Sequence, residues 1–152
     1  MTQSGRPCLH GRRLWGTVTN MTGMSEDAKR LLNEPEYAVL ATVEPDGRPQ
    51  LSVVWIARDH EDVLVSTVRG RRKERNLRRD ARATLLVYPA DNPQEYLEVR
   101  GAVSIEDDPS GSLIQALSQK YTGEPFTEDE GTDHERVIVR LRPEHVVHRR
   151  GS

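Results

Sequence analysis

The segment from Val63 to Tyr88 constrains the fold of this chain more than any other part. It places two short apolar runs, 63–68 and 84–88, around a strongly basic stretch, 69–82. Short apolar runs rich in β-branched residues and bounded by polar residues are typical of buried strands. The basic stretch holds eight Lys/Arg and two acidic residues, which leaves a net charge of +6. Because this charge is held between two buried strands, it predicts a fixed anion-binding surface.

Four more apolar runs have the length and composition of strands. The full set of expected strands is 37–43, 50–56, 63–68, 84–88, 96–105 and 136–142, and residues 144–148 can continue the sheet. A Pro-Asp-Gly turn at 45–47 makes the first two a hairpin. Gly101, inside the fifth strand, indicates a bulge or bend. Residues 58–62 read as a polar turn, and residues 122–135 as a mobile acidic loop.

Helix signals are few. Ser25 is suited to the N-cap of a helix that Pro35 ends. The basic stretch predicts a short surface helix ending near Arg79–Asp80, with Leu77 as its anchor. Asp108 is expected to cap a third helix with Pro109 in its first turn, and the packed face of that helix comprises Leu113, Ile114, Leu117 and Tyr121.

Many short strands, tight turns and few helices predict a mainly β fold, an antiparallel β-barrel with minor α content. At 152 residues the chain fits one domain, expected at 25–150, with residues 1–24 as a disordered extension. The single cysteine, Cys8, excludes a disulfide framework. No apolar run approaches the roughly 18 residues of a membrane span, and no secretory signal is recognisable, so we expect no membrane contact and a cytoplasmic location.

Three interpretations of the basic stretch remain open on the residues alone. It could be a solvated helix, a nucleic-acid patch or a phosphate site. Stacking aromatics are absent from it, and nine acidic residues follow in 105–135, which disfavours nucleic acid. Gly70, Arg71 and Lys73, directly after a strand and at a helix start, favour a phosphate site.

Other catalytic signals are weak. The five histidines lack the spacing of metal ligands, so no metal is expected. Ser52 and Ser66 have no sequence-adjacent base that would make them nucleophiles. The chain has no obvious catalytic acid, base or metal site, but it has a candidate phosphate site. If it is an enzyme, this combination indicates that a bound cofactor supplies the chemistry.

Five segments carry a resemblance to a known family. In chain order they read LATV from Leu40, DGRPQLS from Asp46, VST from Val65, RRKERNLRRDARA from Arg71 and LEVRG from Leu97. Together they resemble the split-barrel flavoproteins that are similar to pyridoxamine 5'-phosphate oxidase, and especially the branch described as dependent on the deazaflavin coenzyme F420. The resemblance covers roughly residues 34–147.

The resemblance implies a six-stranded split β-barrel of the FMN-binding type that forms a homodimer with two cofactor sites at the subunit interface. It implies that Arg71, Arg72 and Lys73 contact the cofactor phosphate, with Asn76 nearby. Residues from two strands would line the ring and its side chain: Gln50, Ser52, Val54, Val65, Ser66 and Thr67. Trp55 and Tyr88 are candidates for the substrate side.

The resemblance leaves the cofactor as a choice between F420 and FMN. FMN-binding oxidases of the family typically carry an arginine at the position of Ser52 and a glutamine at the position of Tyr96. The surplus of basic residues at Arg75, Arg78 and Arg79 suits the oligoglutamate tail of F420. We therefore expect an F420-dependent oxidoreductase that transfers a hydride to a small electrophilic substrate. The alternatives are an FMN-dependent oxidase or reductase and a flavin or deazaflavin carrier without catalysis.

Overall fold

A computed structural model describes residues 18–21 and 23–150 of the chain. The helices are α1 (Glu26–Asn33), α2 (Arg72–Arg79) and α3 (Ser112–Thr122). The strands are β1 (Val18–Met21), β2 (Ala38–Val43), β3 (Pro49–Val54), β4 (Ala57–Asp59), β5 (Asp62–Val68), β6 (Arg82–Val87), β7 (Tyr96–Asp107) and β8 (Arg136–Arg149). None of the described helices is long and apolar enough to cross a membrane.

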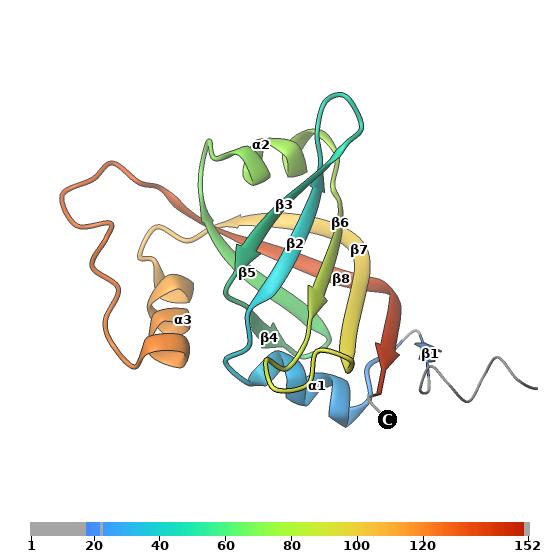
Figure 1. Ribbon diagram of the computed structural model, residues 1–152. Helices are drawn as coiled ribbons and strands as arrows, with labels where there is room; N and C mark the ends of the chain where they lie inside the picture. Colours follow the sequence, from blue (N-terminus) through green and yellow to red (C-terminus); the bar gives the residue numbers. More distant parts are fainter. Residues whose placement is uncertain (1–17, 22, 151–152) are drawn as a thin grey trace, which may run out of the picture.

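The strands form one antiparallel sheet that curls around a hydrophobic interior (Figure 1). Their order is β3-β2-β6-β7-β8-β5-β4, and β1 pairs with β8 outside this path. In the described part of the chain no backbone ladder joins β3 to β4, so the barrel is open along one side. The expected mainly β, antiparallel fold class is confirmed.

The strand count differs from the expected six in two places. Part of the expected polar turn 58–62 is a strand: residues 57–59 pair with residues 62–64 as β4 through a tight turn at His60, whose φ is +53°. Residues 18–21, expected within a disordered extension, pair with the end of β8 as β1. Residues 1–17, with Cys8, and residue 22 lie outside the described residues. Short strands such as these give too weak a sequence pattern to recognise.

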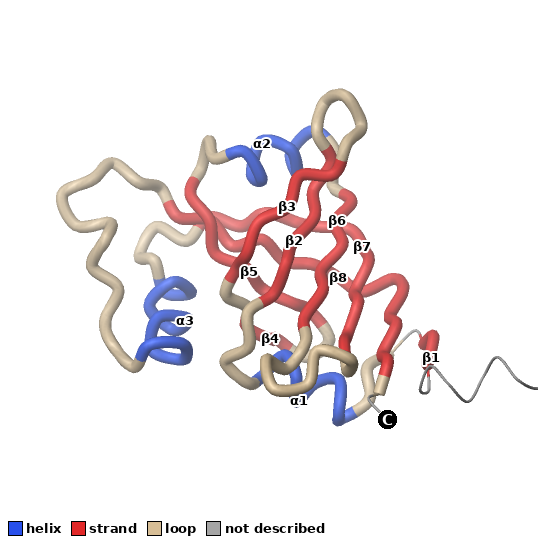
Figure 2. Tube along the Cα trace, viewed as in Figure 1, coloured by secondary structure: helices blue, strands red, loops and turns tan. Residues whose placement is uncertain are grey.

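Local signals account well for α1. The Ser25 hydroxyl accepts a hydrogen bond from the Ala28 amide at 3.2 Å, and the helix ends at Glu34, just before Pro35. Its buried face comprises Ala28, Leu31 and Leu32, and it closes one end of the barrel while α2 lies at the other (Figure 2).

The third helix starts later than expected. Pro109 lies before it, and Gly111, with φ of +66°, is its N-cap residue. Asp108 still caps the helix, because its carboxylate accepts from the amides of Ser112 at 3.1 Å and Leu113 at 2.9 Å. The predicted packed face is confirmed where Leu113 and Leu117 pack against Leu64 of β5 beside Tyr121.

Gly101 lies at the predicted bulge. The register between β7 and β8 shifts between Arg100 and Gly101. A Cβ added at Gly101 would lie 1.9 Å from the carbonyl oxygen of Arg142. The two longest strands can therefore cross closely at this point only because residue 101 has no side chain.

Candidate functional site

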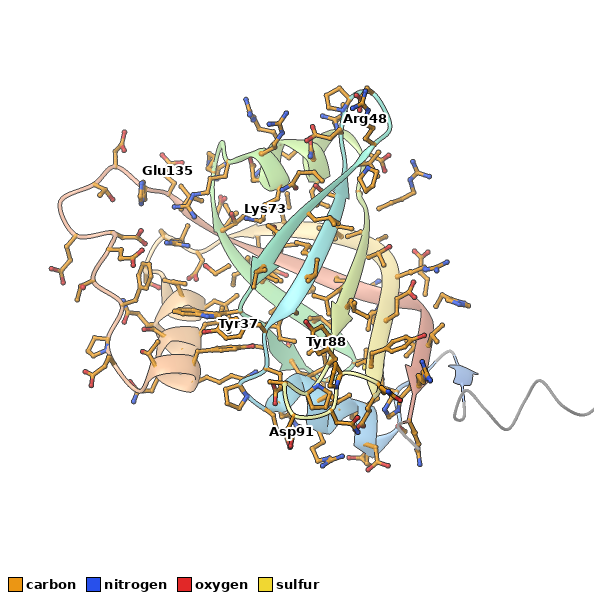
Figure 3. All side chains as sticks on the ribbon, viewed as in Figure 1. Tyr37, Arg48, Lys73, Tyr88, Asp91 and Glu135 are labelled. Atoms are coloured by element: carbon orange, nitrogen blue, oxygen red, sulfur yellow. The ribbon has the colours of Figure 1, made fainter. Side chains whose placement is uncertain are left out.

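A cleft of about 330 Å³ is lined by residues of β3, β5, the start of α2, α3 and the segment that leads into β8. The end of β3 supplies Val53 and Val54, Trp55 follows that strand, and β5 supplies Ser66. The remaining lining residues are Arg71, Lys73, Ile114, Leu117, Phe126, Glu128 and Arg136. Figure 3 labels Lys73 between α2 and α3. The cleft therefore combines a basic part with an apolar part contributed by β3, α3 and the loop after α3.

Two larger hollows, each about 440 Å³, lie elsewhere. One covers the outer face of β2, β6 and β7, and its arginines, Arg82 and Arg100, are ion-paired with Asp80 and Glu98. The other lies at the β2–β3 turn and holds Arg72, ion-paired with Glu44 at 2.7 Å. Size alone would favour these hollows, but their cations are already neutralised, which makes the smaller cleft the better candidate for an anion.

The basic stretch 69–82 divides into partnered and unpartnered side chains. Five have a hydrogen bond or ion pair within the chain: Arg69 with Asp107 and Glu135, Arg72 with Glu44, Arg78 with Glu74, Arg79 with Asn76 and the Val43 carbonyl, and Arg82 with Asp80. Among the described residues, the side chains of Arg71, Lys73 and Arg75 have no such partner. Two of these three lie in the cleft.

Lys73 is half-buried in that cleft. Desolvation by burial lowers the pKa of its ammonium group from the usual 10.5, and the nearby charges of Arg71 and Arg136 lower it further. An anion placed beside Arg71 and Lys73 would therefore relieve a mutual repulsion as well as form new hydrogen bonds.

The start of α2 is organised by a carboxylate that sequence reasoning missed. Glu74 is buried, and it accepts from the Gly70 amide at 2.9 Å and from Arg78. The Gly70 amide is therefore engaged within the chain and is not free to bond an anion. Positive φ at Gly70, +90°, lets the chain turn from β5 into the helix, which brings Arg71 and Lys73 to the cleft.

The structure places Arg72 and Asn76 outside the cleft. Arg72 lies at the β2–β3 turn, as described above. Asn76 is buried and donates to the hydroxyl of Thr42 at 3.0 Å, and Thr42 in turn donates to Gln50 at 2.8 Å. Gln50 and Asn76 thus hold α2 against β2 and β3, and in the described structure both act as internal contacts.

The expected strand residues divide between two faces of the barrel wall. Ser66 lines the cleft. The side chains of Ser52, Val65 and Thr67 point to the interior face of the barrel, in alternation with outward-pointing neighbours. On this face Val54 and Val65 belong to the main hydrophobic cluster. The hydroxyls of Ser52, Ser66 and Thr67 are buried without a hydrogen-bonding partner in the described structure. Unsatisfied buried hydroxyls are costly, so these three are candidates to bond a ligand.

The two aromatic candidates differ in position. The Trp55 ring forms part of the cleft and stacks on Tyr121, with ring centroids 5.3 Å apart and planes 10° apart. Tyr88 follows β6 and lies toward the α1 end of the barrel, away from Lys73 (Figure 3). Tyr88 is 39% exposed on the outer surface and does not line the cleft.

Comparison with known proteins identifies the family. The sequence profile of pyridoxamine 5'-phosphate oxidase matches residues 24–150. This chain belongs to that family. A solved structure described as an F420 reductase is 38% identical, covers 81% of this chain and 98% of its own, and superposes with a TM-score of 0.73.

Two further structures show the range of this family. A conserved hypothetical protein from Mycobacterium tuberculosis is 26% identical over 90% of this chain and 88% of its own, with a TM-score of 0.69. An FMN-binding protein related to pyridoxamine 5'-phosphate oxidase, from Nostoc punctiforme, is 20% identical over 78% and 75%, with a TM-score of 0.55. At 20% identity, the similarity to the Nostoc punctiforme protein shows the fold alone. The expected family resemblance is confirmed.

Sequence reasoning missed the α3 side of the cleft in this member of the pyridoxamine 5'-phosphate oxidase family. Ile114 and Leu117 belong to a helix face that was read only as core, and Phe126 and Glu128 lie in the loop expected to be mobile. That loop is held by side-chain contacts, including Ser118 to the Glu124 carbonyl at 2.7 Å and Arg69 to Glu135 at 2.8 Å. The sequence feature that could have indicated this side of the cleft is Phe126, the single phenylalanine of the chain, which lies in an acidic loop.

Lys120 is a second lysine whose pKa is lowered, to about 8, by burial. Its ammonium group donates to the carbonyls of Leu32 at 2.8 Å and Ile56 at 2.6 Å. It therefore connects α3 to α1 and to the segment between β3 and β4, and it does not line the cleft. Among the described residues, no group of three His, Cys, Asp or Glu side chains could hold a metal ion.

Proposed function

We propose that this chain is an oxidoreductase that binds coenzyme F420 in the cleft between the barrel and α3. The observation that carries the proposal is the pair of cations without partners, Arg71 and Lys73, beside the unsatisfied hydroxyl of Ser66. The 38% identity to an F420 reductase favours the deazaflavin over FMN. FMN remains the second candidate, because the family includes FMN-binding members of the same fold.

The residues present fit a phosphorylated tricyclic cofactor. Arg71 and Lys73 would bind the phosphate with charge-assisted hydrogen bonds. The hydroxyl of Ser66 would bond the ring or its side chain, whereas Ser52 and Thr67 face the barrel interior and do not line the cleft. Val54 and Trp55 would pack against the apolar ring and exclude water from it.

When bound, reduced F420 supplies a hydride from C5 of its deazaflavin ring to a small electrophilic organic substrate. The chain's own part is to position the ring and to neutralise the phosphate. No described residue of the cleft is assigned as a general acid, so we propose that a solvent proton completes the reduction.

The oligoglutamate tail of F420 has fewer available contacts than the basic stretch suggested. Arg78 and Arg79 bind within the chain, which leaves Arg75 as the one outer arginine of this stretch without a partner in the described structure. We therefore assign the tail only to Arg75, and the preference for F420 rests chiefly on the similarity to the F420 reductase.

We also propose that two copies associate through the outer face of β3. Leu51 and Val53 on this edge strand are 62% and 68% exposed, and Tyr37 beside it is 60% exposed. Large apolar side chains gathered on one outer face are typical of a protein interface. Val53 also lines the cleft, so a second copy on this face would reach the rim of the cofactor site. Light scattering tests this proposal: we expect a dimer for the native chain and a monomer for Leu51→Glu, and a monomeric native chain would overturn it.

Titration of the purified protein with F420 and with FMN, followed by fluorescence, tests the cofactor site. The variants are Arg71→Ala and Lys73→Ala, and Arg82→Ala is the control because Arg82 is ion-paired outside the cleft. Loss of one charge-assisted contact is expected to weaken binding by roughly 10- to 100-fold in each variant and not in the control. Micromolar FMN binding without F420 binding would reject the cofactor assignment. Unchanged affinity in both variants would reject the phosphate site.

Turnover separates an enzyme from a carrier. A reductase oxidises reduced F420 when a naphthoquinone is added, and Lys73→Ala slows this reaction at low cofactor concentration. A carrier binds the reduced cofactor with the same affinity but shows no quinone-dependent oxidation. A panel of quinones that gives no oxidation in the presence of tight binding would favour the carrier.

A further inference from the structure

The loop from Gly123 to Glu135 connects α3 to β8 (Figure 1). Within it, the backbone of Phe126 is held by one side chain of α3. The Gln115 side chain donates from Nε2 to the Phe126 carbonyl at 2.8 Å and accepts at Oε1 from the Phe126 amide at 3.0 Å. A single α3 side chain therefore satisfies both backbone polar groups of Phe126. Such a paired contact fixes the residue's position as a strand ladder would.

The ring of Phe126 is also fixed from one side. The guanidinium carbon of Arg136 lies 4.9 Å from the ring centroid. Arg136 is itself held by Asp129, whose two carboxylate oxygens accept from it at 2.7 and 3.0 Å. Arg136 is only 8% exposed, so it supports the ring from a buried position. Its guanidinium group already donates hydrogen bonds to Asp129.

Core packing does not account for this arrangement. Phe126 is half-exposed, and within the described residues it belongs to neither of the two hydrophobic clusters of the fold. Its ring is instead one wall of the cleft that holds Arg71 and Lys73. An aromatic side chain fixed by polar contacts but left out of the core is free to contact a ligand.

We propose that Phe126 is a specificity-determining residue that contacts the planar aromatic part of the cleft's ligand, and that Gln115 is the residue that positions it. The cleft has a cationic part at Arg71 and Lys73 and an apolar part at Trp55, Ile114, Leu117 and Phe126. A ligand that joins a phosphate to a flat aromatic ring matches both parts. This inference rests on the proposed function only in taking this cleft as the ligand site.

The test pairs each ligand with its phosphate-free form: FMN with riboflavin, and F420 with its deazaflavin core. We expect Phe126→Leu to weaken binding of both members of a pair by the same factor, roughly two- to tenfold, because an aromatic contact is lost. Phe126→Tyr keeps the ring and is expected to restore affinity. Lys73→Ala weakens only the phosphorylated member. The two proposals therefore fail separately: a Lys73 variant without effect rejects the phosphate site, and unchanged binding of both pair members by folded Phe126→Leu rejects the aromatic wall.

A double-mutant cycle tests the role of Gln115. If Gln115 acts only through Phe126, Gln115→Leu weakens binding in the native chain and has no further effect in the Phe126→Leu background. Gln115→Met, which keeps the side-chain length and removes both hydrogen bonds, is expected to give a similar loss and serves if the leucine variant does not fold. Gln119→Leu is the matched control, because Gln119 lies one turn along α3, caps only the Gly123 carbonyl and does not line the cleft. Additive effects of Gln115→Leu and Phe126→Leu, or an equal loss in the Gln119 control, would overturn the positioning role.

Discussion

The side chain of Asn76 donates a hydrogen bond to the hydroxyl of Thr42, at 3.0 Å, and both residues are buried. The Thr42 hydroxyl donates a hydrogen bond to Oε1 of Gln50, and Arg79 donates to the side-chain oxygen Oδ1 of Asn76 at 3.1 Å. A continuous polar chain therefore joins β3, β2 and α2. Because every link is buried or half-buried, removal of its central member leaves unpaired polar atoms.

Replacement of Asn76 by alanine is expected to lower the free energy of unfolding by about 1–3 kcal/mol, the cost of leaving a buried partner unsatisfied. Urea denaturation measures this change. Arg75→Ala is the matched control on the neighbouring residue, which is exposed and without a partner in the described structure, and it is expected to stay within about 0.5 kcal/mol of the native chain. Equal losses in the two variants would show that the polar chain contributes nothing specific.

Affinity for a phosphorylated cofactor is expected to fall at alkaline pH, because the ammonium group of Lys73 loses its proton there. Burial, with Arg71 and Arg136 nearby, lowers the pKa of Lys73 in the free protein, so its charge is lost at a pH below the usual 10.5. Only the protonated form attracts phosphate, and binding therefore weakens as pH rises through this lowered pKa. The measurement is the dissociation constant of FMN or F420 between pH 7 and 10. Lys73→Arg keeps its charge throughout and should remove most of the decline. A native profile that is flat over this interval would contradict the assignment.

Glu128 is the one carboxylate among the lining residues of the cleft, opposed by Arg71, Lys73 and Arg136. Glu128→Gln removes a charge that repels an anionic ligand, and we expect the affinity for FMN or F420 to rise by roughly two- to fivefold at low salt. The gain should shrink in high salt because exposed charges are screened. Glu130→Gln, in the same loop but outside the cleft, is the control. A loss of affinity in Glu128→Gln would instead indicate that this carboxylate accepts a hydrogen bond from the ligand.

Gly101→Ala should be among the most damaging single-methyl additions in the barrel. The new Cβ would meet the Arg142 carbonyl oxygen at 1.9 Å and its carbon at 2.9 Å, and these backbone atoms cannot move without breaking the β7–β8 ladder. We expect a loss of roughly 3 kcal/mol in unfolding free energy, at the upper end of overpacking costs. Thermal denaturation checks it against Gly23→Ala, whose Cβ would meet no atom within 4 Å.

Sequence patterns predicted the elements whose causes are local. Ser25, the Pro-Asp-Gly turn and Gly101 each specify their backbone through their own chemistry, and the structure has the helix, hairpin and bulge at these places. The start of α3 was misplaced because Gly111, with a left-handed backbone, takes the N-cap position while Asp108 caps from outside the helix. Capping at this distance depends on a turn that the pattern does not fix.

The candidate site was only partly predictable, because its composition depends on contacts between distant parts of the chain. Sequence can count the arginines of 69–82, but Arg69 is neutralised by Glu135, and Arg79 binds a carbonyl of β2. Among the described residues Arg71 and Lys73 have no such partner, and no local pattern distinguishes them from their paired neighbours. Phe126 enters the cleft through Gln115, which lies eleven residues earlier on a different element. Such pairings are set by the fold, so local pattern carries no information about them.

The central position of β8 has a consequence for synthesis on the ribosome. β5 pairs only with β4 and β8, and β8 is translated after every other described strand. Until β8 emerges from the exit tunnel, the nascent chain can form the four-stranded part of the sheet with the order β3-β2-β6-β7, but β5, together with the Arg71–Lys73 segment that follows it, cannot yet join that sheet. The proposed ligand cleft would therefore be completed only late in the maturation of this protein, and a stalled chain that lacks β8 would expose β5 as an aggregation-prone edge.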